Sequence, residues 1–197
     1  LPAGVTALVV GMQPLLTALG AGWLLGEQVS GRQWGGLALG FVGVGLVVSG
    51  KFGEAALGPM LIPALVALLG ITAGTLYQKR FCAKFDLRTG SVIQFVPTAI
   101  VTAIAIVLFE DFHVEWTGQF TFALGWLVLV LSLGAISLLN LLIRSGSAVN
   151  VASLFYLTPL STALIAWAIF GEKLTLTAAV GMALAVSGVY LVARPAK

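Results

Sequence analysis

The chain has 197 residues, of which 59% are hydrophobic and 9% are charged, and its net charge is +3. A water-soluble domain carries about 25% charged residues, so this composition excludes a water-facing surface of normal size and predicts an all-α integral membrane protein. One cysteine, Cys82, cannot form a disulfide within the chain.

Seven apolar runs lie between the charged segments, and a helix needs about 20 apolar residues to cross the hydrocarbon core. The runs are continuous rather than alternating, which favours helices over barrel strands. In chain order the predicted spans are Val5–Gly26, Trp34–Gly50, Leu57–Gln78, Gly90–Phe109, Phe120–Ile143, Val149–Gly171 and Leu176–Ala193. The sequence therefore predicts a polytopic helical bundle.

The charges between the runs predict the orientation of the spans. Basic residues follow the third, fifth and seventh runs, namely Lys79, Arg80, Lys84, Arg88, Arg144, Arg194 and Lys197. Lys and Arg are enriched in cytoplasmic connections, so these segments and the C-terminus are predicted to lie inside. The acidic connection from Glu110 to Glu115 is then outside. The predicted location is the inner (plasma) membrane, crossed several times.

The first and sixth runs repeat one motif. Pro14 and Pro159 are 145 positions apart (159 minus 14). The same offset separates Thr17 from Thr162, Gly26-Glu27 from Gly171-Glu172, Gly36 from Gly181 and Gly43 from Gly188. One register held over roughly forty residues indicates an internal duplication. The copies are an odd number of spans apart, so they are predicted to cross the membrane in opposite directions, as inverted repeats of secondary transporters do.

Through these paired motifs the chain resembles the EamA-type members of the drug/metabolite transporter superfamily. The resemblance implies ten helices in two inverted five-helix repeats, of which seven are present. Residues 1–50 correspond to the last two helices of the first repeat, and residues 57–194 to the complete second repeat. Three further helices are expected ahead of the first residue given.

The resemblance also implies a function, a secondary transporter of small metabolites such as amino acids or related compounds that works by alternating access. Export is the commoner direction in such a family. The alternative is a membrane subunit or truncated remnant that acts only with a partner chain. The expected partners are a small metabolite and the lipid bilayer, with no nucleic acid and with a homodimer possible. No cofactor or metal is expected.

Candidate substrate-binding residues surround the two repeated prolines. Proline removes a backbone hydrogen bond and kinks a helix, so either a freed carbonyl faces a central cavity or the kink serves packing. Polar side chains in a bilayer are costly unless they face protein or water. The candidates are Gln13, Pro14, Thr17, Asn140, Tyr156, Thr158, Pro159 and Thr162. Gln13 and Thr158 occupy equivalent positions and are the first choice for lining a cavity; hydrogen bonding between helices is the alternative.

Other chemistry has weaker support. Glu27 and Glu172 each follow an apolar run, where a carboxylate would cap the amide groups of the next helix rather than carry a coupling proton. A nucleophilic serine needs a base. Ser145 has none on its predicted inner side, because His113 is predicted to lie outside. An enzyme is therefore not predicted.

Overall fold

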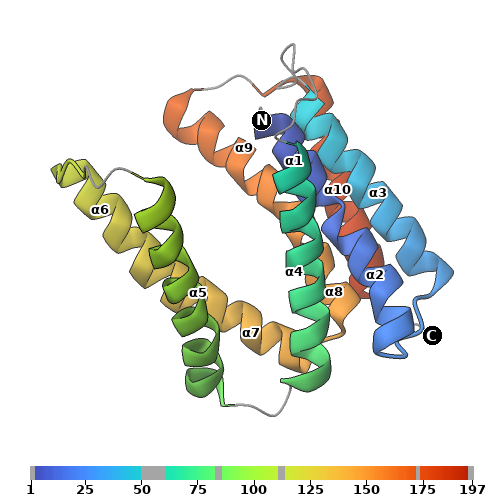
Figure 1. Cartoon of the computed structure of the whole chain (residues 1–197). Helices are drawn as coiled ribbons and strands as arrows, with labels where there is room; N and C mark the ends of the chain where they lie inside the picture. The colour runs from blue at the N-terminus through green and yellow to red at the C-terminus, as the bar shows by residue number, and fades with distance from the viewer. Residues whose placement is uncertain (1–2, 50–60, 83–85, 111–113, 172–173, 195–197) are drawn as a thin grey trace. The chain divides into compact units, whose positions relative to one another are not determined.

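The structure is a computed structural model that describes residues 3–49, 61–82, 86–110, 114–171 and 174–194, and these residues form helices and no strands (Figure 1). The chain divides into two compact units. Unit 1 comprises Leu1–Arg80 and Gly146–Lys197, and unit 2 comprises Phe81–Ser145. Unit 1 holds α1 (Ala3–Gly11), α2 (Gln13–Leu24), α3 (Gly31–Val48), α4 (Leu61–Phe81), α8 (Ala148–Ser153), the 3-10 turn η3 (Leu154–Tyr156), α9 (Leu157–Phe170) and α10 (Leu176–Ala193).

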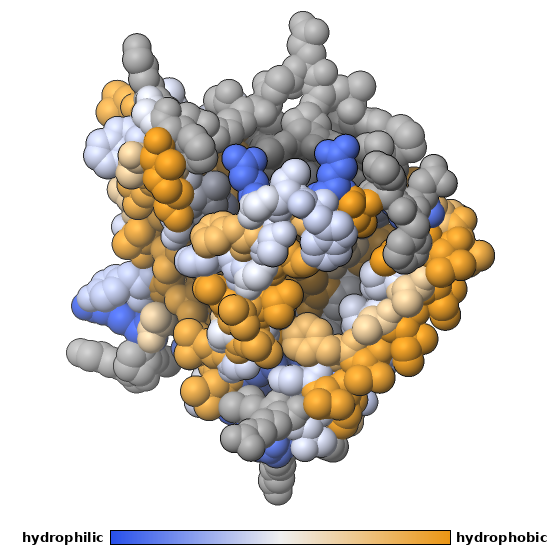
Figure 2. Space-filling model, turned by 90° about the vertical axis from the view of Figure 1, so that its left-hand side faces the viewer, coloured by the Kyte–Doolittle hydropathy of each residue, from blue (hydrophilic) through white to orange (hydrophobic). Residues whose placement is uncertain are grey.

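The prediction of a polytopic helical membrane protein is confirmed. Six described helical segments are long and apolar enough to cross a membrane: Thr6–Leu24, Leu61–Phe81, Thr89–Phe109, Gly118–Ser145, Ala148–Ile169 and Leu176–Ala193. The remaining predicted span is α3, a helix of 18 residues that begins with polar Arg32 and Gln33 and is rich in glycine. Apolar side chains predominate on the face of the molecule seen in Figure 2, as expected for a surface that meets lipid.

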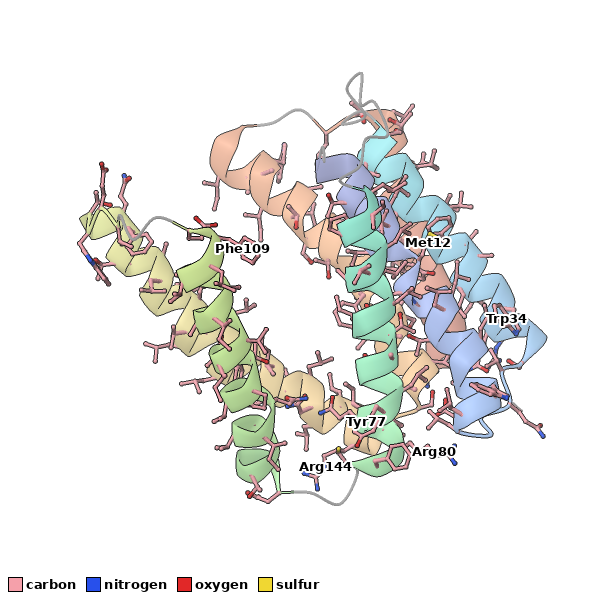
Figure 3. All side chains as sticks on the ribbon, in the orientation of Figure 1. Met12, Trp34, Tyr77, Arg80, Phe109 and Arg144 are labelled. Carbon is pink, nitrogen blue, oxygen red and sulfur yellow. The ribbon has the colours of Figure 1, made fainter. Side chains whose placement is uncertain are left out.

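The two repeated prolines lie where spans one and six are interrupted. The first span breaks at Met12, between α1 and α2 (Figure 3), and Pro14 lies in the first turn of α2. A proline is tolerated there because the amide it lacks would have no partner within the helix. The sixth span changes from α8 to a 3-10 turn before α9, whose third residue is Pro159. Both predicted kinks are therefore breaks between helical segments.

The repeated Gly-Glu pairs end one helix and precede the next. Gly26 and Gly171 both have φ of 67°, a left-handed conformation that residues with a Cβ adopt at a cost. The following helices start at hydroxyl caps that share the repeat offset. The Ser30 Oγ accepts from the Gln33 amide at 3.3 Å, and the Thr175 Oγ1 accepts from the Ala178 amide at 3.2 Å. The left-handed glycine of the motif therefore ends one helix, and the hydroxyl cap that follows begins the next.

Gly171→Ala is expected to lower the free energy of unfolding by about 1 kcal/mol, because alanine is strained at positive φ. Gly74→Ala is the matched control, since Gly74 lies in α4 and an added Cβ there would meet nothing within 4 Å. That control should be neutral or slightly stabilising, because alanine favours the helix. Thermal unfolding in detergent micelles compares the two, and equal melting temperatures would contradict the role of Gly171 as a helix stop.

Unit 1 is built on the close antiparallel packing of α3 against α10. A Cβ placed on Gly36 would lie 2.7 Å from the Gly188 carbonyl oxygen, and one on Gly43 would lie 2.6 Å from the Gly181 carbonyl oxygen. These are the four glycines of the repeat. Gly36 contacts Gly188, the copy of Gly43, and Gly43 contacts Gly181, the copy of Gly36. Small residues at such spacing let helix backbones approach closely in a membrane. The reciprocal pairing is what a two-fold relation between α3 and α10 would produce.

Unit 2 contains the predicted fourth and fifth spans. These are α5 (Leu87–Phe109), with Pro97 in its interior, and a second helical segment made of α6 (Gly118–Trp126), η2 (Leu127–Ala135) and α7 (Ile136–Ser145). The sequence predicts one uniform helix over the second segment, whereas η2 has π-helical hydrogen bonding. Short π-helical stretches inside longer helices are rare and frequently mark functional positions. Within the unit, α5 packs against α7.

Candidate functional site

Four of the predicted site residues are buried in unit 1, where α2 and the 3-10 turn η3 contribute to one hydrophobic core. Gln13, Pro14 and Thr17 lie on α2, and Tyr156 ends the 3-10 turn that α8 leads into. Gln13 is 1% exposed, and Thr17 and Tyr156 are 0% exposed. Within the unit, α2 packs against α8, which leads into the turn that holds Tyr156.

A glycine makes room for the buried tyrosine. A Cβ on Gly40 of α3 would lie 2.4 Å from the Tyr156 Cδ2 atom, so the ring packs directly on the α3 backbone. The sequence pattern alone did not predict this contact between Gly40 and Tyr156. The repeat offers a signal in retrospect, because the position equivalent to Gly40 is Ala185 and the position equivalent to Tyr156 is Gly11. The large side chain and the glycine that accommodates it therefore occur in one of the two copies only.

The polar atoms of this buried group lack hydrogen-bond partners within the described part of the chain. They are the Gln13 Oε1 and Nε2, the Thr17 Oγ1 and the Tyr156 hydroxyl. A buried polar atom without a partner costs about 1–3 kcal/mol, and native structures leave few of them. Together these groups offer amide and hydroxyl donors and acceptors and carry no formal charge. They suit an uncharged or zwitterionic polar molecule better than an ion.

The remaining candidates lie elsewhere. Thr158 and Thr162 are exposed on α9, and Pro159 is partly buried. The Thr162 hydroxyl donates to the Thr158 carbonyl at 3.0 Å, within the helix. Asn140 is buried on α7 and belongs to unit 2. The equivalent residues Gln13 and Thr158 therefore have different environments, one buried and one exposed.

Glu27 does cap helical amides, but the prediction that it caps the next helix is wrong. Its Oε1 accepts from the Ala148 amide at 3.0 Å, which places the carboxylate at the start of α8, 121 positions away. The next helix, α3, is instead capped by Ser30 and Gln33, whose side chain accepts from the Ser30 amide at 2.9 Å. The local hydroxyl cap leaves the carboxylate available for a distant helix. Glu172 lies outside the described residues.

Basic side chains gather at the same end of unit 1. Arg80 lies at the end of α4 (Figure 3) and donates to the Leu24 carbonyl at the end of α2. Lys79 donates to the Gly146 carbonyl. Arg32 donates to the Arg194 carbonyl at the end of α10. Cations beside the carboxyl ends of helices are favoured by the helix dipole. We call this the basic end of unit 1; it carries the segments predicted to be cytoplasmic.

The hydroxyl of Ser145, the serine weighed as a nucleophile, donates to the Leu141 carbonyl at 3.0 Å within its own helix. No three His, Cys, Asp or Glu side chains come together in the part of the chain that the structure describes. His113, the histidine weighed as a base, lies outside that part.

Comparison with known proteins gives the family and the fold. Residues 58–194 match the EamA-like transporter family. The chain is 31% identical to the uncharacterized transporter YvbV of Bacillus subtilis over 196 residues, covering 98% of this chain and 63% of YvbV. It is 26% identical to the uncharacterized inner membrane transporter YedA of Escherichia coli K12 over 175 residues, covering 88% of this chain and 56% of YedA.

A solved crystal structure shares the fold with a TM-score of 0.82 at 22% identity, covering 98% of this chain and 68% of that one. The chain thus spans about three fifths of the length of the curated relatives it matches. The matched segment starts three positions before α4 and ends one residue after α10, and so includes the proline and Gly-Glu motif of the sixth span. The chain belongs to the EamA-like transporter family.

Proposed function

We propose that this protein is a secondary transporter that exports small, uncharged or zwitterionic metabolites, such as amino acids or related compounds, by alternating access between two inverted repeats. Membership of the family supports transport. The observation that carries the substrate class is the group of buried polar atoms on Gln13, Thr17 and Tyr156 that have no partner in the described residues. A substrate that supplies donors and acceptors would satisfy them.

Charge supports the same class of substrate. The apolar runs carry no Asp, Glu, Lys, Arg or His in their middle portions, and a net charge buried without a counter-charge costs several kcal/mol. An acidic or basic solute would have to meet that cost at a site made of amide and hydroxyl groups. A zwitterion brings both charges together and needs no charged partner from the protein.

The reciprocal glycine contacts between α3 and α10 support the inverted repeat. Gly36 meets Gly188 and Gly43 meets Gly181, so exchanging the two copies maps one contact onto the other. Two halves related in this way can exchange conformations and open one site to either side of the membrane. Gln13 and Thr158 are equivalent positions of the two copies, yet Gln13 is buried and Thr158 is exposed. Such a difference is expected within either one of two conformations that exchange the environments of the copies.

Counterflow into proteoliposomes tests the proposal, using the protein as its gene encodes it. The panel holds glutamine, threonine and leucine as zwitterions of no net charge, with glutamate and lysine as charged comparisons. We expect flux of at least one of the first three and at least tenfold less flux of the last two, as the cost of burying a net charge predicts. Solute flux measured in inside-out vesicles under a solute gradient gives the direction of transport. No flux of any solute would contradict transport, and equal flux of charged solutes would contradict the substrate class.

A further inference from the structure

Three hydrogen bonds at the basic end of unit 1, outside the α3–α10 pair, join residues of the first copy, 1–50, to residues that follow position 57. The Ala148 amide donates to Glu27 Oε1 at 3.0 Å, and Gln33 Nε2 donates to Asn150 Oδ1 at 3.3 Å. Arg80 donates to the Leu24 carbonyl. We define these three contacts as the latch. Each involves a charged side chain or a side-chain amide at a helix end.

The latch lies where spans one and six pack together. Next to it, α2 contacts α8, and Ala18, Ala21 and Ala152 are 0–1% exposed. The opposite end of unit 1 is the one at which α3 and α9 end. The repeat allows a matched comparison: Thr17 is 0% exposed, whereas its equivalent, Thr162, is exposed. Spans one and six are therefore packed together at the basic end, and the two equivalent threonines differ in burial.

We propose that the latch is the gate that keeps the basic end closed in a conformation whose opposite end is open, and that it must break when the transporter opens toward the basic end. This rests on the proposed alternating access. In the alternate conformation the copies exchange environments, so Thr162 becomes buried between α9 and α1 while Thr17 becomes accessible. Separating α2 from α8 then pulls Glu27 away from the amide of Ala148.

One latch contact has no copy of the same chemistry. The equivalents of Gln33 and Asn150 are Ala178 and Val5, whose side chains lack polar atoms, whereas the equivalents of Glu27 and Ala148 are Glu172 and Ala3. The Gln33–Asn150 bond is therefore specific to the basic end.

Thiol accessibility from each side of the membrane tests the latch, using the protein as its gene encodes it with every cysteine, Cys82 included, replaced by serine. One reporter is Thr17→Cys and the other, at the equivalent position, is Thr162→Cys. A membrane-impermeant cationic methanethiosulfonate is added to right-side-out and to inside-out vesicles. Before any latch change, the Thr162→Cys reporter should react from one side and the Thr17→Cys reporter should not react. A Thr162→Cys reporter that fails to react from either side would overturn the open end.

Glu27→Ala removes a hydrogen bond to a charged group, and about tenfold faster labelling of the Thr17→Cys reporter is expected from such a loss. Labelling of the Thr162→Cys reporter should become slower in the same variant, because the opposite end closes when the basic end opens. Glu27→Gln keeps an acceptor oxygen, so its labelling rate at the Thr17→Cys reporter should lie between those of the parent and of Glu27→Ala. Glu115→Ala is the matched control, since Glu115 is exposed in the acidic connection. Asn150→Ala tests the latch independently if Glu27→Ala does not accumulate.

Reciprocity separates a gate from a local support. Faster labelling at position 17 with unchanged labelling at position 162 would mean that Glu27 only stiffens the start of α8, and would overturn the latch. Unchanged labelling at both positions would overturn it as well. Counterflow of the same solutes is measured on the parent protein. Absence of flux together with reciprocal labelling would contradict the proposed function but uphold the latch, whereas flux without reciprocity would contradict the latch alone.

Discussion

Gly43→Ala is expected to lower the free energy of unfolding by about 1–3 kcal/mol, the usual cost of overpacking a close contact. The new methyl group would lie 2.6 Å from both the Ala185 amide nitrogen and the Gly181 carbonyl oxygen. These are backbone atoms of α10, so no side-chain rotation relieves the clash and the two helices must separate. Gly43→Leu should prevent accumulation of folded protein. Thermal unfolding and the yield of monodisperse protein in detergent measure both effects.

Gly35→Ala is the matched control for this substitution. Gly35 is exposed on the same helix, and a Cβ there would meet nothing within 4 Å. Alanine should be neutral or stabilise by up to about 1 kcal/mol, since it favours the helix over glycine. Gly181→Ala should resemble Gly43→Ala, because the two glycines face each other. If Gly43→Ala and Gly35→Ala unfold at the same temperature, the close approach of α3 and α10 is wrong.

Much of the fold can be predicted because its determinants are local in sequence. Apolar runs identify the spans, and Gly26 and Gly171 mark helix ends that the structure places in the left-handed region. The prolines predict kinks in spans one and six, where the structure has breaks between helical segments. The constant offset also predicts which glycines are equivalent. It does not by itself say that Gly36 meets Gly188, which depends on the antiparallel packing of two helices.

The candidate site is harder to predict, because burial depends on which helices are in contact. Gln13 and Thr158 follow the same pattern in the sequence, yet one is buried and the other exposed. Glu27 finds its partner 121 positions away, and a local pattern favours the neighbouring helix instead. The π-helical stretch Leu127–Ala135 has no comparable sequence signal, since its apolar residues also suit an ordinary helix. Each of these features depends on tertiary contacts.

The opposite burial of equivalent residues links the fold to the proposed cycle. A duplicated sequence with two identical environments would predict one symmetric state, whereas this chain places Thr17 in the core and Thr162 at the surface. A protein that alternates between two such states must hold each with contacts that can break. Hydrogen bonds at helix ends suit that role, because water can replace them when the end opens. The glycine contacts between α3 and α10 offer no such exchange and are expected to persist.

Thr17→Val and Tyr156→Phe are expected to raise the stability of the substrate-free protein while lowering transport at least tenfold. Each change removes a buried hydroxyl that has no partner in the described residues, and removing such a group stabilises by about 1 kcal/mol or more. Transport should fall because the same hydroxyls would bind the substrate. Thermal unfolding without solute and counterflow of the transported amino acid measure the two effects in the same preparations.

Thr72→Val is the matched control, because it makes the same change at a buried hydroxyl that does have a partner. The Thr72 hydroxyl donates to the Leu68 carbonyl at 2.8 Å, and the residue is 6% exposed. It should be neutral or destabilising and should leave the substrate concentration at half-maximal flux unchanged. Loss of stability in Thr17→Val together with unchanged transport would assign the buried hydroxyls to packing. Gain of stability with loss of transport would instead mean that unfavourable burial is maintained at this site because the substrate needs those groups.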